Sequence, residues 1–159
     1  MPEVHPTAFV DLSAQVIGDV LIGPESSIWM QAVVRGDVNS IRIGGRTNIQ
    51  DGTVVHVRRG GHPTVIGDDV TVGHGAIVHG CTVENRVLIG MGATVLNGAR
   101  IGEESIVAAG ALVTEGMVVP PRSMVMGVPG KVRRALTDAE VAGIRESAER
   151  HVQHKEEYR

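Results

Sequence analysis

The sequence predicts an all-β solenoid, a parallel β-helix of hexapeptide repeats that is followed by one C-terminal helix. Two patterns and one feature of the composition support this fold. An apolar, mostly β-branched residue recurs every six positions, and a small or moderate side chain stands two residues before it. Only 2% of the residues are aromatic although 42% are hydrophobic, as expected for a narrow prism filled by Val, Ile and Ala. Such short strands must stack on neighbouring repeats to be stable.

The repeat runs from Val10 to Val119, and three consecutive repeats make one coil of eighteen residues. The spacing widens twice, which predicts that residues 37–40 and 57–62 are loops outside the coil. Glycine often follows the apolar residue of the repeat, where we expect a turn that needs positive φ. We call these apolar residues the anchors: Val10, Val16, Ile22, Ile28, Val34, Ile43, Ile49, Val55, Ile66, Val72, Val78, Val83, Ile89, Val95, Ile101, Val107, Val113 and Val119.

The chain divides into three segments: a β-helix at 1–119, an extended connector at 120–136 and an amphipathic helix at 137–159. Two consecutive prolines at 120–121 end the repeat. Thr137 and Glu140 are spaced as a capping box, which marks the start of the helix. Apolar residues then recur at helical spacing, and we expect the tail at 153–159 to be frayed.

Composition and charge exclude several classes of function. The net charge is −3 and no basic stripe is combined with aromatic residues, so nucleic acid is not an expected partner. No apolar run is long enough to span a membrane. The N-terminus lacks the basic start and apolar core of a secretion signal, so a cytoplasmic location is expected. The single Cys81 falls on an inward position and is expected to be part of the core.

The stacking of coils brings polar residues into columns. With the two loops subtracted, the residues that follow Val34, Val55 and Val78 form one column, which consists of Arg35, His56 and His79. Two histidines one rung apart can both reach a zinc ion at ~2.0–2.1 Å. The same frame puts Asp51 and His74 in a second column around the corner of the prism.

This geometry predicts a metal site between copies of the chain. A single chain cannot easily direct His74 to the ion that His56 and His79 hold, whereas a three-fold oligomer brings the two columns together. We therefore expect a homotrimer with three metal sites, in which Arg35 pairs with Asp51 across each seam. His5, His151 and His154 lie outside the frame of the repeat and are expected to be solvated.

The chain closely resembles the γ-class carbonic anhydrases over nearly its whole length. The resemblance rests on RGD at 35–37, NIQDG at 48–52, GHGAIVHG at 73–80 and MGVPGK at 126–131, together with His56. It implies a left-handed β-helix, a handedness that the repeat alone does not reveal, and a homotrimer that binds Zn²⁺, or Fe²⁺ or Co²⁺ as in some relatives. The implied reaction is the reversible hydration of carbon dioxide to bicarbonate by a hydroxide bound to the metal.

The resemblance also implies roles for individual residues. His56, His74 and His79 would be the metal ligands, and Gln50 would orient the hydroxide or the substrate. Asp37 and Asn48 would support the hydrogen bonds around Gln50 and the metal. Arg35 and Asp51 would stabilise the subunit interface.

The sequence departs from the family where a proton must leave the site. The best-characterised members carry an acidic loop after the first ligand, whereas residues 57–63 contain no carboxylate, and Val38 stands where a second acid is usual. His62 is a candidate replacement shuttle because its ordinary pKa is near 6.5. Other functions stay open: a metal-dependent thioesterase, a coenzyme A acyltransferase of the hexapeptide class, or a metal-binding scaffold without catalysis.

Overall fold

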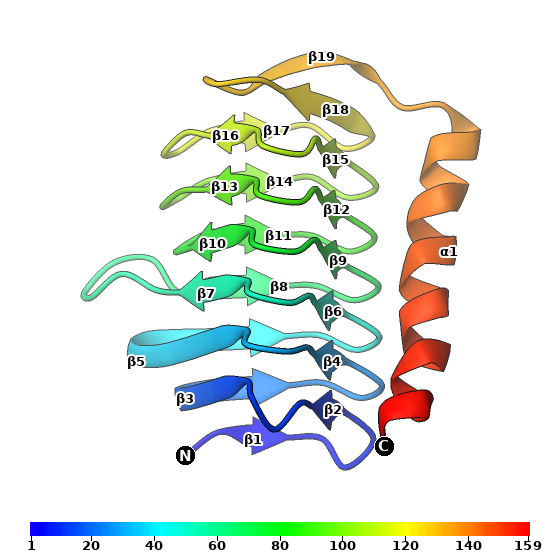
Figure 1. Ribbon diagram of the computed structural model, residues 1–159. Coiled ribbons are helices and arrows are strands. Elements are labelled where there is room, and N and C mark those ends of the chain that lie inside the picture. Colours follow the sequence, from blue (N-terminus) through cyan, green and yellow to red (C-terminus); the bar gives the residue numbers. More distant parts are fainter.

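A computed structural model describes residues 1–159 and shows a parallel β-helix of about seven turns with one helix along its side (Figure 1). The predicted solenoid is confirmed. The prism has three faces. The first face contains β7 (Val54–His56), β10 (Ile77–His79), β13 (Thr94–Val95) and β16 (Leu112–Val113). The second face contains β1 (Glu3–Val4), β8 (Thr64–Ile66), β11 (Thr82–Val83), β14 (Arg100–Ile101) and β17 (Val118–Val119).

The third face contains β2 (Phe9–Val10), β4 (Ser27–Ile28), β6 (Asn48–Ile49), β9 (Thr71–Val72), β12 (Leu88–Ile89), β15 (Ile106–Val107) and β18 (Ser123–Met126). Two longer strands, β3 (Gln15–Ile22) and β5 (Val33–Ile43), turn the corner between the first and second faces. The remaining elements are β19 (Lys131–Ala135), α1 (Asp138–His154) and the 3₁₀ helix η1 (Lys155–Tyr158).

The register of the coils is the one that the repeat predicts. Val34 pairs with Val55 and Val55 with Val78 on the first face, while Ile49 pairs with Val72 on the third. Every anchor from Ile22 onward is buried, and the two earlier ones are partly buried against the same core. Burial of aliphatic side chains along the axis of the prism is therefore the main stabilising contribution.

The expectation that the glycines after the anchors have positive φ is wrong. Gly23, Gly44 and Gly67 do not have positive φ; positive φ falls two residues later, at residues such as Glu25 and Arg46. The glycines are needed because one coil lies directly on the next: a Cβ on Gly44 would lie 2.2 Å from Asp68 Oδ1 and 2.7 Å from the backbone of Gly67. Close approach between coils, and not turn geometry, selects glycine here.

Of the two predicted loops, one is confirmed. Residues 58–62 lie between β7 and β8 and project from the prism (Figure 1), whereas Val57, the first residue of the predicted loop, is buried in the core. Residues 37–40 do not form a loop but belong to β5. They lie between Gly36, which pairs with Gly18, and Ile41, which pairs with Val20, so they are extra residues in an extended strand that bulges outward.

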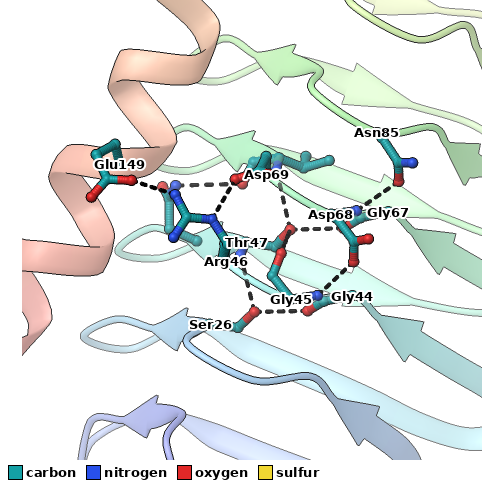
Figure 2. A network of polar contacts seen from close by, with 12 residues as sticks. Ser26, Gly44, Gly45, Arg46, Thr47, Gly67, Asp68, Asp69, Asn85 and Glu149 are labelled. Atoms are coloured by element: carbon teal, nitrogen blue, oxygen red, sulfur yellow. Dashed lines mark hydrogen bonds and ion pairs between the residues drawn. The ribbon is translucent and has the colours of Figure 1, made fainter.

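A polar network at one corner of the prism joins successive coils (Figure 2). Thr47 Oγ1 donates to the carbonyl of Gly67 at 2.7 Å, and Asp68 Oδ1 accepts from the backbone N–H of Gly45 at 2.7 Å. Arg46 donates to Asp69 at 2.8 Å and pairs with Glu149 of α1. The network therefore satisfies polar groups between coils and attaches the helix to the prism.

Helix α1 covers part of the third face. Thr137 and Glu140 form the predicted capping box, with the Glu140 backbone N–H donating to Thr137 Oγ1 at 3.2 Å. Val141 and Ile144 are buried against partly exposed apolar residues of β12 and β15. Residues 120–136, expected as an extended connector, contain β18, which pairs with β15, and the antiparallel β19. No helix has the length and apolar character needed to cross a membrane.

The expectation of a frayed tail is wrong. α1 continues to His154 and is followed by η1. The Lys155 side chain is fully buried, and its Nζ lies 2.9 Å from Glu25 of the coil beneath. The Tyr158 ring packs on Trp29 with the ring centroids 5.2 Å apart. These contacts join the end of the chain to its N-terminal coils.

Candidate metal centre

His56 and His79 end two adjacent strands of the first face, and their rings meet. The two residues are register partners on β7 and β10, as the stacking predicted. His56 Nδ1 lies 3.1 Å from His79 Nε2. Two nitrogens bound at ~2.0–2.1 Å to a tetrahedral zinc ion are about 3.3 Å apart, so this separation fits a shared ion.

The hydrogen bonds of the two rings show which nitrogens are free. His56 Nε2 donates to Asp37 Oδ1 at 2.8 Å, and His79 Nδ1 donates to Asn97 Oδ1 at 2.7 Å. In the neutral rings these bonds use the only proton of each imidazole. When both rings are neutral, His56 Nδ1 and His79 Nε2 therefore face each other as two lone pairs. A cation is the ligand that this arrangement accepts, and imidazole nitrogen is a preferred donor for zinc.

Asp37 and Asn97, which accept these two ring protons, have further partners of their own. The hydrogen bond from His56 is the main cause that lowers the pKa of Asp37, and a hydrogen bond from Arg35 lowers it further. Asp37 is therefore an ionised acceptor at neutral pH. Asn97 is held in turn, because its Nδ2 donates to Glu115 Oε1 at 3.3 Å. Such second partners fix the orientation of metal-binding histidines.

His74 has the same kind of partner on a different part of the prism. Its Nδ1 lies 3.0 Å from Asp51 Oδ2, and this contact leaves Nε2 without a partner in the chain. Both side chains are about half exposed, at 55% and 48%. His74 therefore presents a free, oriented ring nitrogen to the surroundings of the chain.

One chain does not bring the three predicted ligands together. His74 precedes β10 and His79 ends it, so they lie at opposite ends of this strand. No group of three or more His, Cys, Asp or Glu side chains within the chain is placed to hold a metal ion. Arg35 pairs within the chain with Asp37, and Asp51 with His74. The pairing of Arg35 with Asp51 across a seam stays a prediction.

Gln50 and Asn48 lie near His74 and away from the other two histidines. Gln50 Nε2 donates to Asn48 Oδ1 at 3.0 Å, and Asn48 Nδ2 donates to Thr71 Oγ1 at 2.9 Å. Asn48 thus contacts Gln50, whereas Asp37 contacts His56 and Arg35 and has no hydrogen bond to Gln50. The predicted site residues therefore form two separate groups within the chain, which we call the half-sites: the first contains Arg35, Asp37, His56 and His79, and the second contains Asn48, Gln50, Asp51 and His74.

Two cavities adjoin the half-site that contains His74. One, of about 260 Å³, is lined by Gln50, Asp51 and His74 together with residues of the C-terminal helix and Trp29. The other, of about 350 Å³, is bordered by Gln50, His74 and Ser147 of α1 and is largely apolar, with Leu88 and Ile106 in its wall. Polar groups that converge beside apolar walls are typical of small-molecule sites.

The loop that contains His62 folds back onto the first face. The His62 ring lies against Gly98, where an added Cβ would be 3.2 Å from its Cε1. It therefore lies beside Asn97, the partner of His79. The proposed role of His62 as a proton shuttle stays a prediction.

Sequence reasoning missed two groups of this site. Asn97 lies one coil of eighteen residues after His79, so the arithmetic that joined the histidines could have found it. His151, expected to be solvated, is half-buried, and burial lowers the pKa of its imidazole. Its Nε2 lies 3.2 Å from Gln50 Nε2. His154 is about half exposed and stacks on Trp29, with the ring centroids 5.3 Å apart.

Comparison with known proteins shows which family this chain belongs to. Residues 80–115 match the family model "Bacterial transferase hexapeptide (six repeats)". The chain is 58% identical over 139 residues to "Probable carbonic anhydrase" of Methanocaldococcus jannaschii, with 87% of each protein covered. It is 50% identical over 152 residues to "Gamma carbonic anhydrase 1, mitochondrial" of Arabidopsis thaliana, covering 92% of this chain and 55% of that protein.

A solved structure shares the hexapeptide-repeat fold. The crystal structure of a hexapeptide transferase family protein from Anaplasma phagocytophilum has a TM-score of 0.96 and 43% identity, and covers 99% of this chain and 93% of that one. The hexapeptide match agrees with a left-handed parallel β-helix. The chain belongs to the γ-class carbonic anhydrase family of hexapeptide-repeat proteins.

Proposed function

We propose that this protein catalyses the reversible hydration of carbon dioxide to bicarbonate, at zinc sites shared between the copies of a homotrimer. One observation carries the proposal: His56 Nδ1 and His79 Nε2 face each other at 3.1 Å as lone pairs, because Asp37 and Asn97 accept the ring protons. The names of the relatives support carbon dioxide as the substrate.

The chain would supply the ligands from two copies. His56 and His79 of one copy and His74 of a neighbour each have an acceptor that orients the ring, which leaves one nitrogen free for the metal. Three neutral histidines and an open fourth position are a known catalytic zinc arrangement, in which the pKa of a bound water falls to about 7. We expect iron or cobalt to be able to occupy the same donors.

The other residues of the site would bind and orient. Gln50 would hydrogen-bond the attacking water, while Asn48 holds its amide in place at 3.0 Å. The apolar wall beside it suits an uncharged linear substrate that offers few polar atoms. Asp37 keeps the His56 ring in one tautomer.

Mixing of two inactive variants tests the shared site. His56→Ala removes a ligand from one half-site and His74→Ala from the other. A heterotrimer can still build an intact site where a His74→Ala subunit contributes His56 and His79 and a His56→Ala neighbour contributes His74. Random reassembly of equal amounts should restore about a quarter of the sites. The readouts are zinc content and stopped-flow carbon dioxide hydration.

A matched mixture provides the control. His56→Ala mixed with His79→Ala cannot complement, because both variants lack a ligand in the same half-site. Equal recovery in both mixtures, or no recovery in either, would contradict a site between copies. Wild-type protein that is zinc-loaded but inactive toward carbon dioxide would contradict the reaction while leaving the metal site standing.

A second candidate function is the hydrolysis of thioesters. The apolar cavity of about 350 Å³ beside Gln50, His74 and α1 could hold an acyl chain. A panel of acyl thioesters assayed beside carbon dioxide separates the two. Activity that rises with acyl length and exceeds carbon dioxide hydration would favour the thioesterase. A role as a metal-binding scaffold predicts zinc binding with neither activity.

A further inference from the structure

His151, a residue of α1, contacts the candidate site through one hydrogen bond, to Gln50. We propose that His151 is a positioning residue that fixes the side-chain amide of Gln50 with its carbonyl oxygen toward the cavity. This inference rests on the proposed function for its catalytic consequence, although the orientation itself can be measured separately.

The tautomer of His151 follows from its partners. Its Nδ1 lies 2.8 Å from the backbone carbonyl of Ser147, which can only accept, so Nδ1 carries the proton. Nε2 is then a lone pair, and the group 3.2 Å away, Gln50 Nε2, must be the donor. The partial burial of the ring lowers its pKa, which agrees with a neutral imidazole.

The second hydrogen of the Gln50 amide is also used. Gln50 Nε2 donates to Asn48 Oδ1 at 3.0 Å. The orientation of Asn48 is fixed independently, because its Nδ2 donates to the backbone carbonyl of Val70 at 3.4 Å, which can only accept, and to Thr71 Oγ1 at 2.9 Å. A reversed Gln50 amide would place its oxygen against the Asn48 oxygen and the His151 lone pair. Both contacts would then be repulsive, so only one orientation is stable.

The free oxygen of Gln50 has a defined place. No group of the chain donates to Gln50 Oε1, and no buried side-chain oxygen or nitrogen in the chain lacks a partner. Oε1 is therefore accessible, and Gln50 lines the cavity of about 260 Å³ with Asp51 and His74. Gln50 thus offers an acceptor and no donor. It can bind an O–H of the attacking water but would not bind an oxygen of carbon dioxide.

The structure provides a matched pair of variants. His151 and His154 both lie near the end of α1 and both pack on Trp29, with ring centroids 6.2 Å and 5.3 Å from it. Only His151 bonds to Gln50. His151→Phe keeps an aromatic ring but removes the acceptor, His151→Gln can supply an acceptor close to the place of Nε2, and His154→Phe is the control for packing.

We expect His151→Phe to lower kcat/KM for carbon dioxide hydration about three- to tenfold at unchanged zinc content, as the loss of one orienting hydrogen bond predicts. His151→Gln should restore it to within about twofold, and His154→Phe should stay within about twofold of wild type. A packing role would instead affect both Phe variants alike and would not be rescued by Gln.

Nitrogen NMR of the full-length wild-type protein tests the orientation without any variant. The proton should be found on His151 Nδ1, and a scalar coupling should connect Gln50 Nε2 with His151 Nε2. A proton on Nε2, or full activity of zinc-loaded His151→Phe, would overturn the proposal. Should the wild type not hydrate carbon dioxide, the proposed function fails, and the NMR result alone decides whether His151 positions Gln50.

Discussion

Replacement of Asn97 by Ala should weaken zinc binding although Asn97 is not expected to touch the metal. Its Oδ1 accepts the proton of His79 Nδ1 at 2.7 Å and thereby keeps His79 Nε2 free. Without this acceptor the ring can rotate, or can move its proton to the nitrogen that should bind zinc. Removal of such a second partner typically lowers metal affinity 10- to 100-fold, which corresponds to ~1.4–2.7 kcal/mol.

The repeat supplies a control at an equivalent position. Asn85 occupies a corner like that of Asn97, and the Oδ1 atoms of both lie 2.3 Å from where a Cβ would be on the glycine one coil below, Gly67 and Gly80 respectively. Asn85 Oδ1, however, accepts from the backbone N–H of Asp68 at 2.8 Å. Both Ala variants should therefore lose a similar ~1 kcal/mol of stability.

The assay is competition for zinc against a chelator of known affinity, with urea unfolding measured in parallel. Asn97→Ala should raise the zinc Kd 10- to 100-fold, on the order expected for a lost second partner, while Asn85→Ala stays within about twofold of wild type. The reasoning is refuted if the two variants bind zinc equally well, or if the loss of affinity in Asn97→Ala follows its loss of stability alone.

Three further predictions concern single titratable groups. His62→Ala should lower kcat in dilute buffer and recover with added imidazole; an unchanged kcat would end the shuttle hypothesis. The pKa of Glu140 is lowered from 4.5 to about 2, chiefly by hydrogen bonds from Arg134. A lowered carboxyl pKa stabilises the fold above the unfolded value, so this stability should be lost as pH falls from about 4.5 to about 2. The urea midpoint of Glu140→Gln should therefore fall less than that of wild type over this pH range. Identical pH profiles of the two proteins would contradict the prediction. Burial raises the pKa of Cys81 to about 12. Iodoacetamide should therefore modify this thiol only after unfolding, as mass spectrometry can show, and rapid modification of the folded protein would disprove its burial.

Much of the fold could be predicted because the hexapeptide repeat fixes both the period and the stacking. The register of the strands followed once the two predicted loops were subtracted from the spacing of the anchors, so Val34, Val55 and Val78 pair as expected. The period does not, however, say why a residue type is chosen. Gly44 reads as a turn glycine in sequence, and only the coil beneath it shows that a Cβ has no room.

Residues of the candidate site that stand in the repeat could be placed from the sequence, including Asn97, which the coil arithmetic reaches but which was not singled out. His56 and His79 came together by coil arithmetic. His151 could not be placed this way, because the position of α1 depends on contacts with the third face that no period encodes. The same holds for the tail, which was expected to fray but is held by burial of Lys155 beside Glu25.

The proposed division of the metal ligands between the two half-sites predicts how zinc should affect assembly. Within one chain, Asp37 and Asn97 already orient His56 and His79, and Asp51 orients His74, so each half-site is preorganised. Only the association of copies remains to complete the ligand set. A ligand that binds the assembled state alone must stabilise that state by mass action. Zinc should therefore lower the protein concentration at which trimers dissociate, and zinc affinity should fall on dilution below it. Sedimentation with and without zinc measures both, and a zinc affinity independent of protein concentration would show that one chain binds the metal by itself.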